Sequence, residues 1–347
     1  MPGNVNDRRE SRSHMSGVRN VARVLVCAAA IAWVLRRLDW EELSAAWDAS
    51  DKVWIGLAFL VFLPAPLMQA VRLVWILRVQ DISIGYWVSL KLTFAGNFFN
   101  NFVPAGAVGG DFVKGYYITQ RTSHKTEAVT ALLIDRVFGL MSFIMFALAG
   151  LIFVSREQTR GVTPWLYGLA AASAAAVVYV MSYRVRRVLR FERLIDRLPF
   201  AEQFHRVASA TVQMQAHRPI ALNALGATVL AHAFLFVSFT IAAAGLGIRG
   251  DVAGQVAFLA ISLVIATVPV SPAGLGTMEA SMVYFFVNGG YGTTEQVLLL
   301  ALAMRAIQLF WAMPGAAAYL TGSCRPTAGV VAPAPTDRVQ RASNLDA

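Results

Sequence analysis

Apolar residues run along most of the chain in blocks long enough to cross a bilayer. A spanning helix needs about 20 consecutive, mainly apolar residues. Blocks that can hold such a run lie at 53–77, 126–154, 164–183, 219–248 and 295–321, and a further run at about 19–36 precedes them. Since the chain stays hydrophobic after that first run, we interpret it as an uncleaved span rather than a signal peptide. The pattern predicts six full transmembrane helices.

Two more apolar stretches, 86–118 and 252–287, are each interrupted by proline and glycine, in NNFVPAGAVGGD and VPVSPAGLGTME. Proline and clustered glycine break helices. Broken backbone at membrane depth survives only where protein buries it or where it lines a polar cavity. We therefore expect two re-entrant pairs of short helices, each entering and leaving on one side of the membrane. The residues expected to form the breaks are Pro104, Gly106, Gly109, Gly110, Pro272, Gly274 and Gly276.

Composition agrees with an all-α polytopic membrane protein. Charged residues make up 14% of the chain and hydrophobic residues 57%, whereas soluble proteins carry roughly 25% charged residues. The formal net charge of +10 comes from basic residues that punctuate apolar runs. Their expected partner is the anionic cytoplasmic face of a bilayer rather than nucleic acid. The two cysteines, Cys27 and Cys324, offer no disulfide framework and no metal-binding spacing.

The loop charges orient the predicted spans. The first interrupted stretch returns to Lys114, Arg121 and Lys125, and 184–218 is the most basic loop, whereas 37–52 is acidic. The positive-inside rule places both termini and both basic loops in the cytoplasm of a prokaryote, with the protein in its cytoplasmic membrane. If 86–118 crossed the membrane fully, 184–218 would lie outside, so the re-entrant interpretation is favoured.

The same rule divides the chain into parts. We expect a basic cytoplasmic tail over 1–18, a membrane domain over 19–321 and a disordered cytoplasmic tail over 322–347.

An internal repeat relates the two interrupted stretches. Asp111 follows Pro104 by seven residues, and Glu279 follows Pro272 at the same interval. Each acid is followed by a span that carries an arginine, Arg136 in the first copy and Arg305 in the second. The predicted copies, about 53–154 and 219–321, enter the membrane from opposite sides. Inverted repeats with broken helices near the midplane are typical of transporters.

The segments NFFNNFVPAGAVGGD, ALLIDRVFGL and VPVSPAGLGTMEA, followed by a late membrane arginine, resemble the transmembrane region of lysylphosphatidylglycerol synthases, also called the flippase-like domain family. The resemblance extends from about residue 20 to 321. It implies a domain that moves phospholipids, polyprenyl-linked sugars or related lipids. In bifunctional relatives a soluble aminoacyl-transferring domain follows, and because only 26 residues follow Thr321, the synthase activity is not expected here.

Charges within the membrane are costly and mark pairs or sites. Arg72, with Gln69 one turn earlier, either snorkels to the headgroups or contacts a lipid phosphate. Asp135 and Arg136 are about 100° apart around a helix, so they either lock neighbouring helices together or face the substrate.

Arg305 and Gln308 point the same way, and a guanidinium fits phosphate oxygens as a fork. The alternative is that Arg305 pairs with Glu279, and both roles can coexist. Asp111 and Glu279 either face the substrate or cap the second short helix of each pair. Asn97, Asn100 and Asn101 are expected to satisfy broken backbone, and Lys91 and His232 to be structural.

No motif for bond cleavage, metal binding or nucleotide binding is present, so we expect neither an enzyme nor a cofactor. The leading hypothesis is a translocator of an anionic lipid or lipid-linked headgroup, with membrane lipids as partners and no nucleic acid. The alternatives are a non-transporting membrane partner of a lipid synthase or glycosyltransferase, and a small-solute transporter coupled to protons through Asp111 and Glu279.

Overall fold

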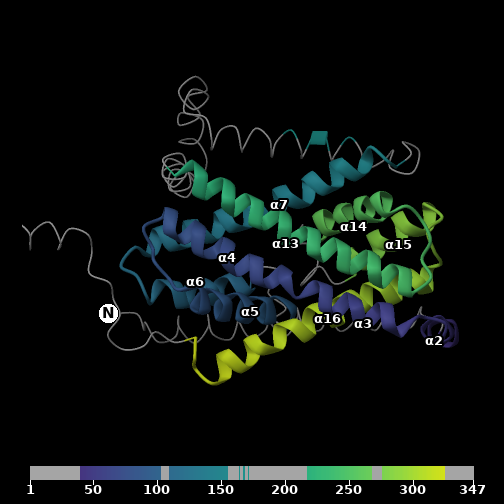
Figure 1. Ribbon diagram of the computed structural model, residues 1–347, viewed down its shortest axis with the longest axis horizontal. Coiled ribbons are helices and arrows are strands. Elements are labelled where there is room, and N and C mark those ends of the chain that lie inside the picture. The colour runs from purple at the N-terminus through teal and green to yellow at the C-terminus, as the bar shows by residue number, and fades with distance from the viewer. Residues whose placement is uncertain are drawn as a thin grey trace, which may run out of the picture.

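The computed structural model describes residues 40–102, 109–154, 217–267 and 276–324, together with Pro164, Tyr167, Gly168 and Ala171. Four long apolar helical segments run side by side through this part of the chain (Figure 1). They are α3 and α4 (Lys52–Phe62 and Pro64–Val79, continuous as Lys52–Val79), α7 (Lys125–Leu151), α13 (Arg218–Gly245) and α16 (Thr294–Leu320). At 1.5 Å per residue each is about 40 Å long, enough to cross a bilayer.

Shorter helices occupy the two interrupted stretches. In the first, α5 (Tyr86–Phe102) and α6 (Gly109–Thr119) pack against each other, and in the second α14 (Val252–Thr267) packs against α15 (Thr277–Asn288). We call these pairs the first and second hairpins. The proline and glycine clusters fall between the two helices of each pair, largely outside the described residues.

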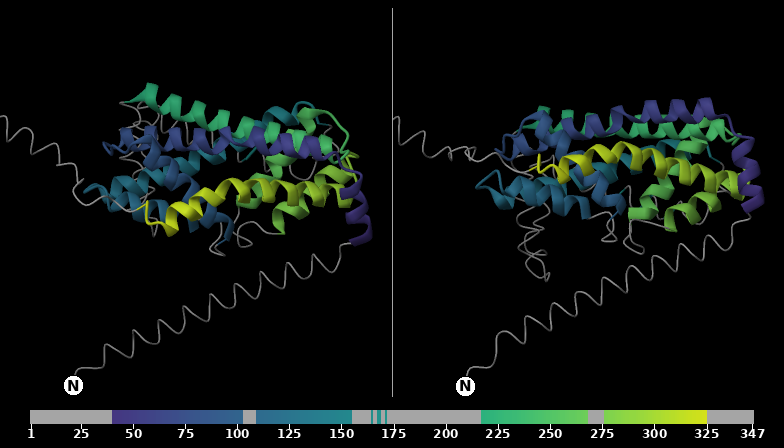
Figure 2. Two further views of the ribbon diagram at one scale, coloured as in Figure 1. Left: turned by 60° about the horizontal axis from the view of Figure 1, so that its bottom comes forward. Right: turned by 90° about the horizontal axis from the view of Figure 1, so that it is seen from below.

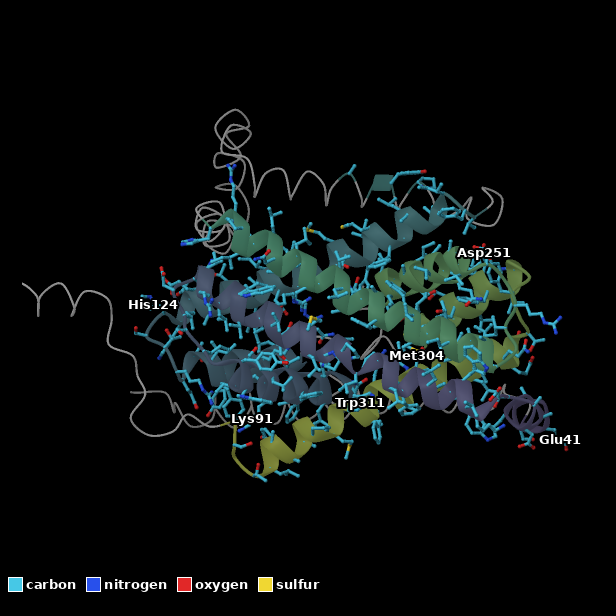
Figure 3. All side chains as sticks on the ribbon, viewed as in Figure 1. Glu41, Lys91, His124, Asp251, Met304 and Trp311 are labelled. Atoms are coloured by element: carbon cyan, nitrogen blue, oxygen red, sulfur yellow. The ribbon has the colours of Figure 1, made fainter. Side chains whose placement is uncertain are left out.

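The two hairpins open at opposite ends of the bundle (Figure 1). At one end, the Arg121 guanidinium in the turn after α6 donates to the Cys324 carbonyl beyond α16, 2.6 Å away. At the other end, Asp51 N–H donates to the Gly245 carbonyl, and Arg249 N–H donates to the Tyr291 carbonyl. Figure 3 labels Lys91 and His124 towards the first end, and Glu41 and Asp251 towards the second.

We name the ends by their charge. The basic end carries Arg78, Arg121, Lys125 and Arg218, against Asp81 and Glu127. The acidic end carries Glu41, Asp48, Asp51, Asp251 and Glu295, against Lys52 and Arg249. A short helix, α2 (Trp40–Asp48), lies across the acidic end just before α3 (Figure 2).

The two halves of the bundle, residues 52–151 and 218–320, exchange contacts reciprocally. Helix α7 of the first half packs on α14 of the second, and α16 of the second packs on α5 of the first, while α13 packs along α3 and α4. Glycine allows both exchanged contacts. A β-carbon on Gly150 would meet Ala257 of α14, and one on Gly315 would overlap the backbone of Phe94 and Ala95 in α5.

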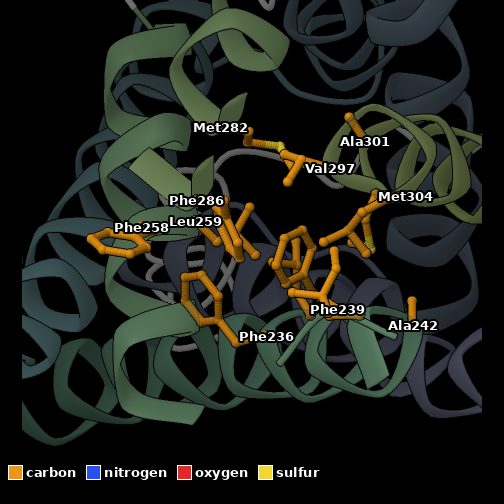
Figure 4. Packing of buried hydrophobic residues seen from close by; sticks show 14 of the residues in the cluster. Phe236, Phe239, Ala242, Phe258, Leu259, Met282, Phe286, Val297, Ala301 and Met304 are labelled. Carbon is orange, nitrogen blue, oxygen red and sulfur yellow. The ribbon is translucent and has the colours of Figure 1, made fainter. Parts of the chain in front are cut away.

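The buried apolar residues form two clusters, one for each hairpin. The larger cluster surrounds the second hairpin and is rich in phenylalanine and methionine (Figure 4). The smaller cluster joins α4, α5, α6, α7 and the start of α13 near the basic end. Because neither hairpin buries its apolar faces alone, each depends on the long helices of both halves for its position.

The structure confirms an all-α polytopic membrane protein. Four of the six predicted spans, at 53–77, 126–154, 219–248 and 295–321, coincide with long apolar helices to within three residues. The predicted spans at 19–36 and 164–183, the basic loop 184–218 and the two tails lie wholly or almost wholly outside the described residues. The re-entrant course of the hairpins and the domain limits stay predictions.

Candidate functional site

Arg136 of α7 pairs with Asp111 of α6 through its Nε. Asp111 lies in the first turn of α6, where free backbone N–H groups also favour a negative charge. The Arg136 side chain is 39% exposed and that of Asp111 16%. The pair therefore joins the second helix of the first hairpin to the following long helix while leaving part of the guanidinium open to other contacts. We call these two residues the first half-site.

Arg305 of α16 pairs with Glu279 of α15 in the same way, and we call these residues the second half-site. Glu279 also accepts a 2.8 Å hydrogen bond from the Gly276 N–H at the start of α15. The two roles foreseen for Glu279, helix cap and ion-pair partner, thus coexist. The Arg305 side chain is 22% exposed. Gln308 lies one turn farther along α16 and is half-buried.

A third ion pair lies deeper, between α4 and α7. Arg72 Nε is 2.6 Å from Asp135 Oδ1, and Arg72 Nη2 donates to Asp135 Oδ2 at 2.9 Å. Thr228 of α13 accepts a long contact of 3.5 Å from the same guanidinium. Both charged side chains are only 8% exposed. Snorkelling of Arg72 to the headgroups is therefore wrong, and the pair locks α4 to α7. Gln69, one turn before Arg72, accepts a hydrogen bond from the Asn97 side chain of α5.

The backbone around the hairpin breaks shows why glycine is needed. Gly110 N–H donates to Asn100 Oδ1 at 2.7 Å, and a β-carbon on Gly110 would overlap the Gly96 carbonyl. Asn100 thus satisfies a backbone group at the break, as the sequence predicts. Gly276 has φ +83°, a conformation that residues with a β-carbon rarely adopt. Gly109 is buried at the start of α6, while Pro104, Gly106, Pro272 and Gly274 lie outside the described residues.

Sequence reasoning missed the position of Lys114. It was expected in a basic loop after the first hairpin, but it lies within α6 and is 6% exposed. The apolar stretch 86–118 contains this residue, but its positive charge was interpreted as a marker of the cytoplasmic surface. His232, expected to be structural, is also buried; it stacks on Phe143 with ring centroids 4.0 Å apart.

Outside the membrane-spanning segments, a few pKa values depart from their ordinary values. A 2.5 Å hydrogen bond from the Tyr291 hydroxyl lowers the pKa of Asp251 at the acidic end. Burial, followed by the nearby Asp251 carboxylate, raises the pKa of Tyr291. Burial lowers the pKa of Arg121 at the basic end. These groups brace the loops at the two ends and do not reach the half-sites.

Within the described ranges, no cluster of three or more histidine, cysteine, aspartate or glutamate side chains is arranged to hold a metal ion. The groups available at the half-sites are two guanidiniums and two carboxylates. A partly exposed guanidinium can exchange its carboxylate for the oxygens of a phosphate, because both present the same forked acceptor. The site is therefore chemically suited to holding and releasing a phosphate-bearing group.

Comparison with known families gives the molecule its context. The model of the lysylphosphatidylglycerol synthase TM region matches residues 20–315. The chain belongs to this family. A UPF0104 membrane protein of Pyrococcus horikoshii is 21% identical over 290 residues, which cover 74% of this chain and 82% of the relative. Family membership makes this a membrane protein linked to lipid handling, and all four residues of the two half-sites fall within the matched region.

Proposed function

We propose that the protein translocates an anionic lipid or lipid-linked headgroup, such as a phospholipid or a polyprenyl-linked lipid, across the cytoplasmic membrane. The observation that carries this proposal is the pair of half-sites. Each half of the bundle presents one partly exposed arginine, held by a carboxylate on the second helix of its hairpin. Since the hairpins open at opposite ends, the two guanidiniums are offered to a headgroup arriving from opposite sides.

The chemistry of the exchange supports a translocator. When a phosphate displaces Glu279 from Arg305, the carboxylate keeps its hydrogen bond from the Gly276 N–H. When a phosphate displaces Asp111 from Arg136, the carboxylate stays at the positive end of α6. Neither acid is left without a stabilising group, so both ion pairs can open and close repeatedly. This account makes the protein a transporter rather than an enzyme.

Charge at the two ends supports an orientation. The basic end faces the cytoplasm in this proposal, because loops rich in arginine and lysine stay on that side. The first hairpin is then a re-entrant pair open to the cytoplasm, and the second is open to the outside. Both termini, beyond the described residues, belong to the cytoplasm.

The test is reconstitution of the purified full chain into vesicles that contain fluorescent phosphatidylglycerol or phosphatidylcholine, with chemical quenching of the outer leaflet. Wild-type protein should accelerate movement of phosphatidylglycerol between leaflets. The rate should fall in the order arginine, lysine, glutamine at both Arg136 and Arg305, because lysine keeps the charge but loses the fork. Melting temperatures of the same variants control for folding.

Several outcomes decide against the proposal. Wild-type vesicles that move lipid no faster than empty vesicles would favour the non-transporting partner of a lipid enzyme. Full transport by Arg136→Gln and Arg305→Gln would exclude phosphate binding by these arginines. Solute uptake that depends on a proton gradient and on Asp111 and Glu279, without lipid movement, would favour the small-solute transporter.

A further inference from the structure

Lys114 lies beside the first half-site. It follows Asp111 by three residues on α6, so the two side chains leave the same side of the helix. Its aliphatic chain lies over Gly96 of α5, where an added β-carbon would come within 3.2 Å of Lys114 Cγ and Cδ. With 6% of its surface exposed, Lys114 is held between the two helices of the hairpin instead of extending to the membrane surface.

Lys114 is a largely buried residue whose amine has no counter-charge within ion-pair distance among the described residues. In the described helices, three arginines away from the helix ends each have a carboxylate: Arg72 has Asp135, Arg136 has Asp111 and Arg305 has Glu279. In the described ranges no ion pair or hydrogen bond involves the Lys114 amine. A buried ammonium without a counter-charge is strongly unfavourable. Among the described residues, Lys114 is thus the interior cation that has room for an anion arriving from the membrane.

The second half-site has no counterpart of this charge. Asp111 and Glu279 are 168 residues apart, and the same spacing relates Lys114 to Met282, which is 0% exposed in the phenylalanine-rich cluster (Figure 4). The formal charge is +1 for Asp111, Lys114 and Arg136 together, and zero for Glu279 and Arg305. A headgroup with a net negative charge is matched by the first half-site but not by the second.

We propose that Lys114 is the specificity-determining residue of the first half-site and that, together with Arg136, it binds the phosphate of a net-anionic headgroup. This assignment rests on the proposed translocation of an anionic lipid. It adds the residue that selects the negative headgroup and the end of the bundle from which the headgroup enters. Zwitterionic headgroups bring a second positive charge close to Lys114 and Arg136, so they are disfavoured there. The headgroup enters from the basic end, where the first hairpin opens.

Equilibrium binding of fluorescent phosphatidylglycerol and phosphatidylcholine to the full chain in mixed micelles tests the assignment. Lys114→Met installs the residue that stands at the matching position of the second half. It should weaken phosphatidylglycerol binding about tenfold, the effect of one charge-assisted contact, and should change phosphatidylcholine binding less than twofold. Lys114→Arg should retain the preference. Lys91→Met, which removes an exposed lysine from α5, is the matched control and should bind like wild type.

Two further measurements separate specificity from structure and lipid from free phosphate. The melting temperature of Lys114→Met should equal or exceed that of wild type, because an uncompensated buried charge is removed. Inorganic phosphate at millimolar concentration should not displace the fluorescent lipid, since the acyl chains hold the lipid in place.

Unchanged phosphatidylglycerol binding by Lys114→Met would overturn the assignment, and so would equal losses for both lipids with a lowered melting temperature. Complete displacement of the fluorescent lipid by inorganic phosphate would show that the site binds a free anion rather than a lipid headgroup. If lipid binding depends on Lys114 but the protein moves no lipid between the leaflets of vesicles, the proposed translocation is wrong and the assignment of Lys114 stands. If the protein moves lipid but its preference for anionic headgroups does not depend on Lys114, the assignment of Lys114 is wrong and the proposed translocation stands.

Discussion

The two halves of the bundle share a plan but differ in what they bury. Three interior positions carry charge in the first half, at Arg72, Lys114 and Asp135. Ser238 corresponds to Arg72 at the 166-residue spacing between the starts of α3 and α13. Met282 and Met304 correspond to Lys114 and Asp135 at the spacings of 168 and 169 residues that relate the two half-sites. Away from the helix ends, the charged residues that the described parts of both halves share are the arginine and carboxylate of each half-site. Shared residues thus mark the common chemistry of the half-sites, and differing residues mark what one half does alone.

At the corresponding positions of the second half, Ser238 and Met304 are uncharged. The Ser238 hydroxyl donates to the Ala58 carbonyl of α3 at 2.7 Å, which joins α13 to the first half, and Met304 packs into the larger apolar cluster. A neutral hydrogen bond and apolar packing hold the helices there. In the first half, a buried ion pair joins α4 to α7, one residue before Arg136.

The strongest test of this difference removes one partner of the buried pair. Arg72→Met or Asp135→Met alone should cost about 3–5 kcal/mol of unfolding free energy, because each leaves a buried charge unpaired. The double variant, which makes the first half apolar like the second, should recover most of that loss. Denaturant unfolding of the purified variants in one detergent measures both effects. If the double variant were as unstable as the singles, the cause would be lost packing rather than charge.

A second test compares the two exchanged helix contacts. Gly315→Val should destabilise the protein by about 1–3 kcal/mol or more, because the added atoms meet the backbone of α5, which cannot rotate away. Gly150→Val should act in the same direction at the contact of α7 with α14. Gly139→Val is the control, since a β-carbon there meets nothing within 4 Å. If Gly139→Val lowers the melting temperature as much as the other two variants, the loss of stability comes from valine in a helix and not from the lost contact between helices.

The smallest expected effect lies at the acidic end. The lowered pKa of Asp251 means that its charged form is favoured in the folded protein. Its contribution is present above the ordinary aspartate pKa of about 4 and is lost as the pH falls through the folded-state value. Tyr291→Phe removes the donor and should cost no more than about 1 kcal/mol at neutral pH, given solvent screening.

Unfolding of wild type, Tyr291→Phe and Tyr284→Phe at several pH values measures this contribution. The deficit of Tyr291→Phe should disappear in acid, while Tyr284→Phe, which changes an exposed tyrosine, should match wild type throughout. A deficit of constant size at every pH would assign it to packing of the Tyr291 ring.

The hydrophobic pattern was sufficient to predict most of the described fold. Lipid requires long apolar helices, so the spans at 53–77, 126–154, 219–248 and 295–321 could be read directly, and glycine and proline marked the hairpin breaks. The repeat likewise identified Arg136 and Arg305 with their acids.

Pairing across the bundle was harder to predict. Arg72 and Asp135 are 63 residues apart and meet only because α4 packs on α7. Whether Lys114 is buried depends on Gly96 of the neighbouring helix, which makes room for its side chain. Such facts follow from which helices touch, and periodicity along one helix does not contain that information.

The central claim, that the hairpins open on opposite faces of the membrane, is tested most directly by two-sided cysteine labelling. In a chain with Cys27 and Cys324 replaced, Ser123→Cys lies at the turn after α6, and Asn288→Cys at the end of α15; both positions are exposed. In intact cells an impermeant thiol reagent should label Asn288→Cys and spare Ser123→Cys, and inverted membrane vesicles should give the reverse. Labelling of both cysteines from the same side would contradict the account.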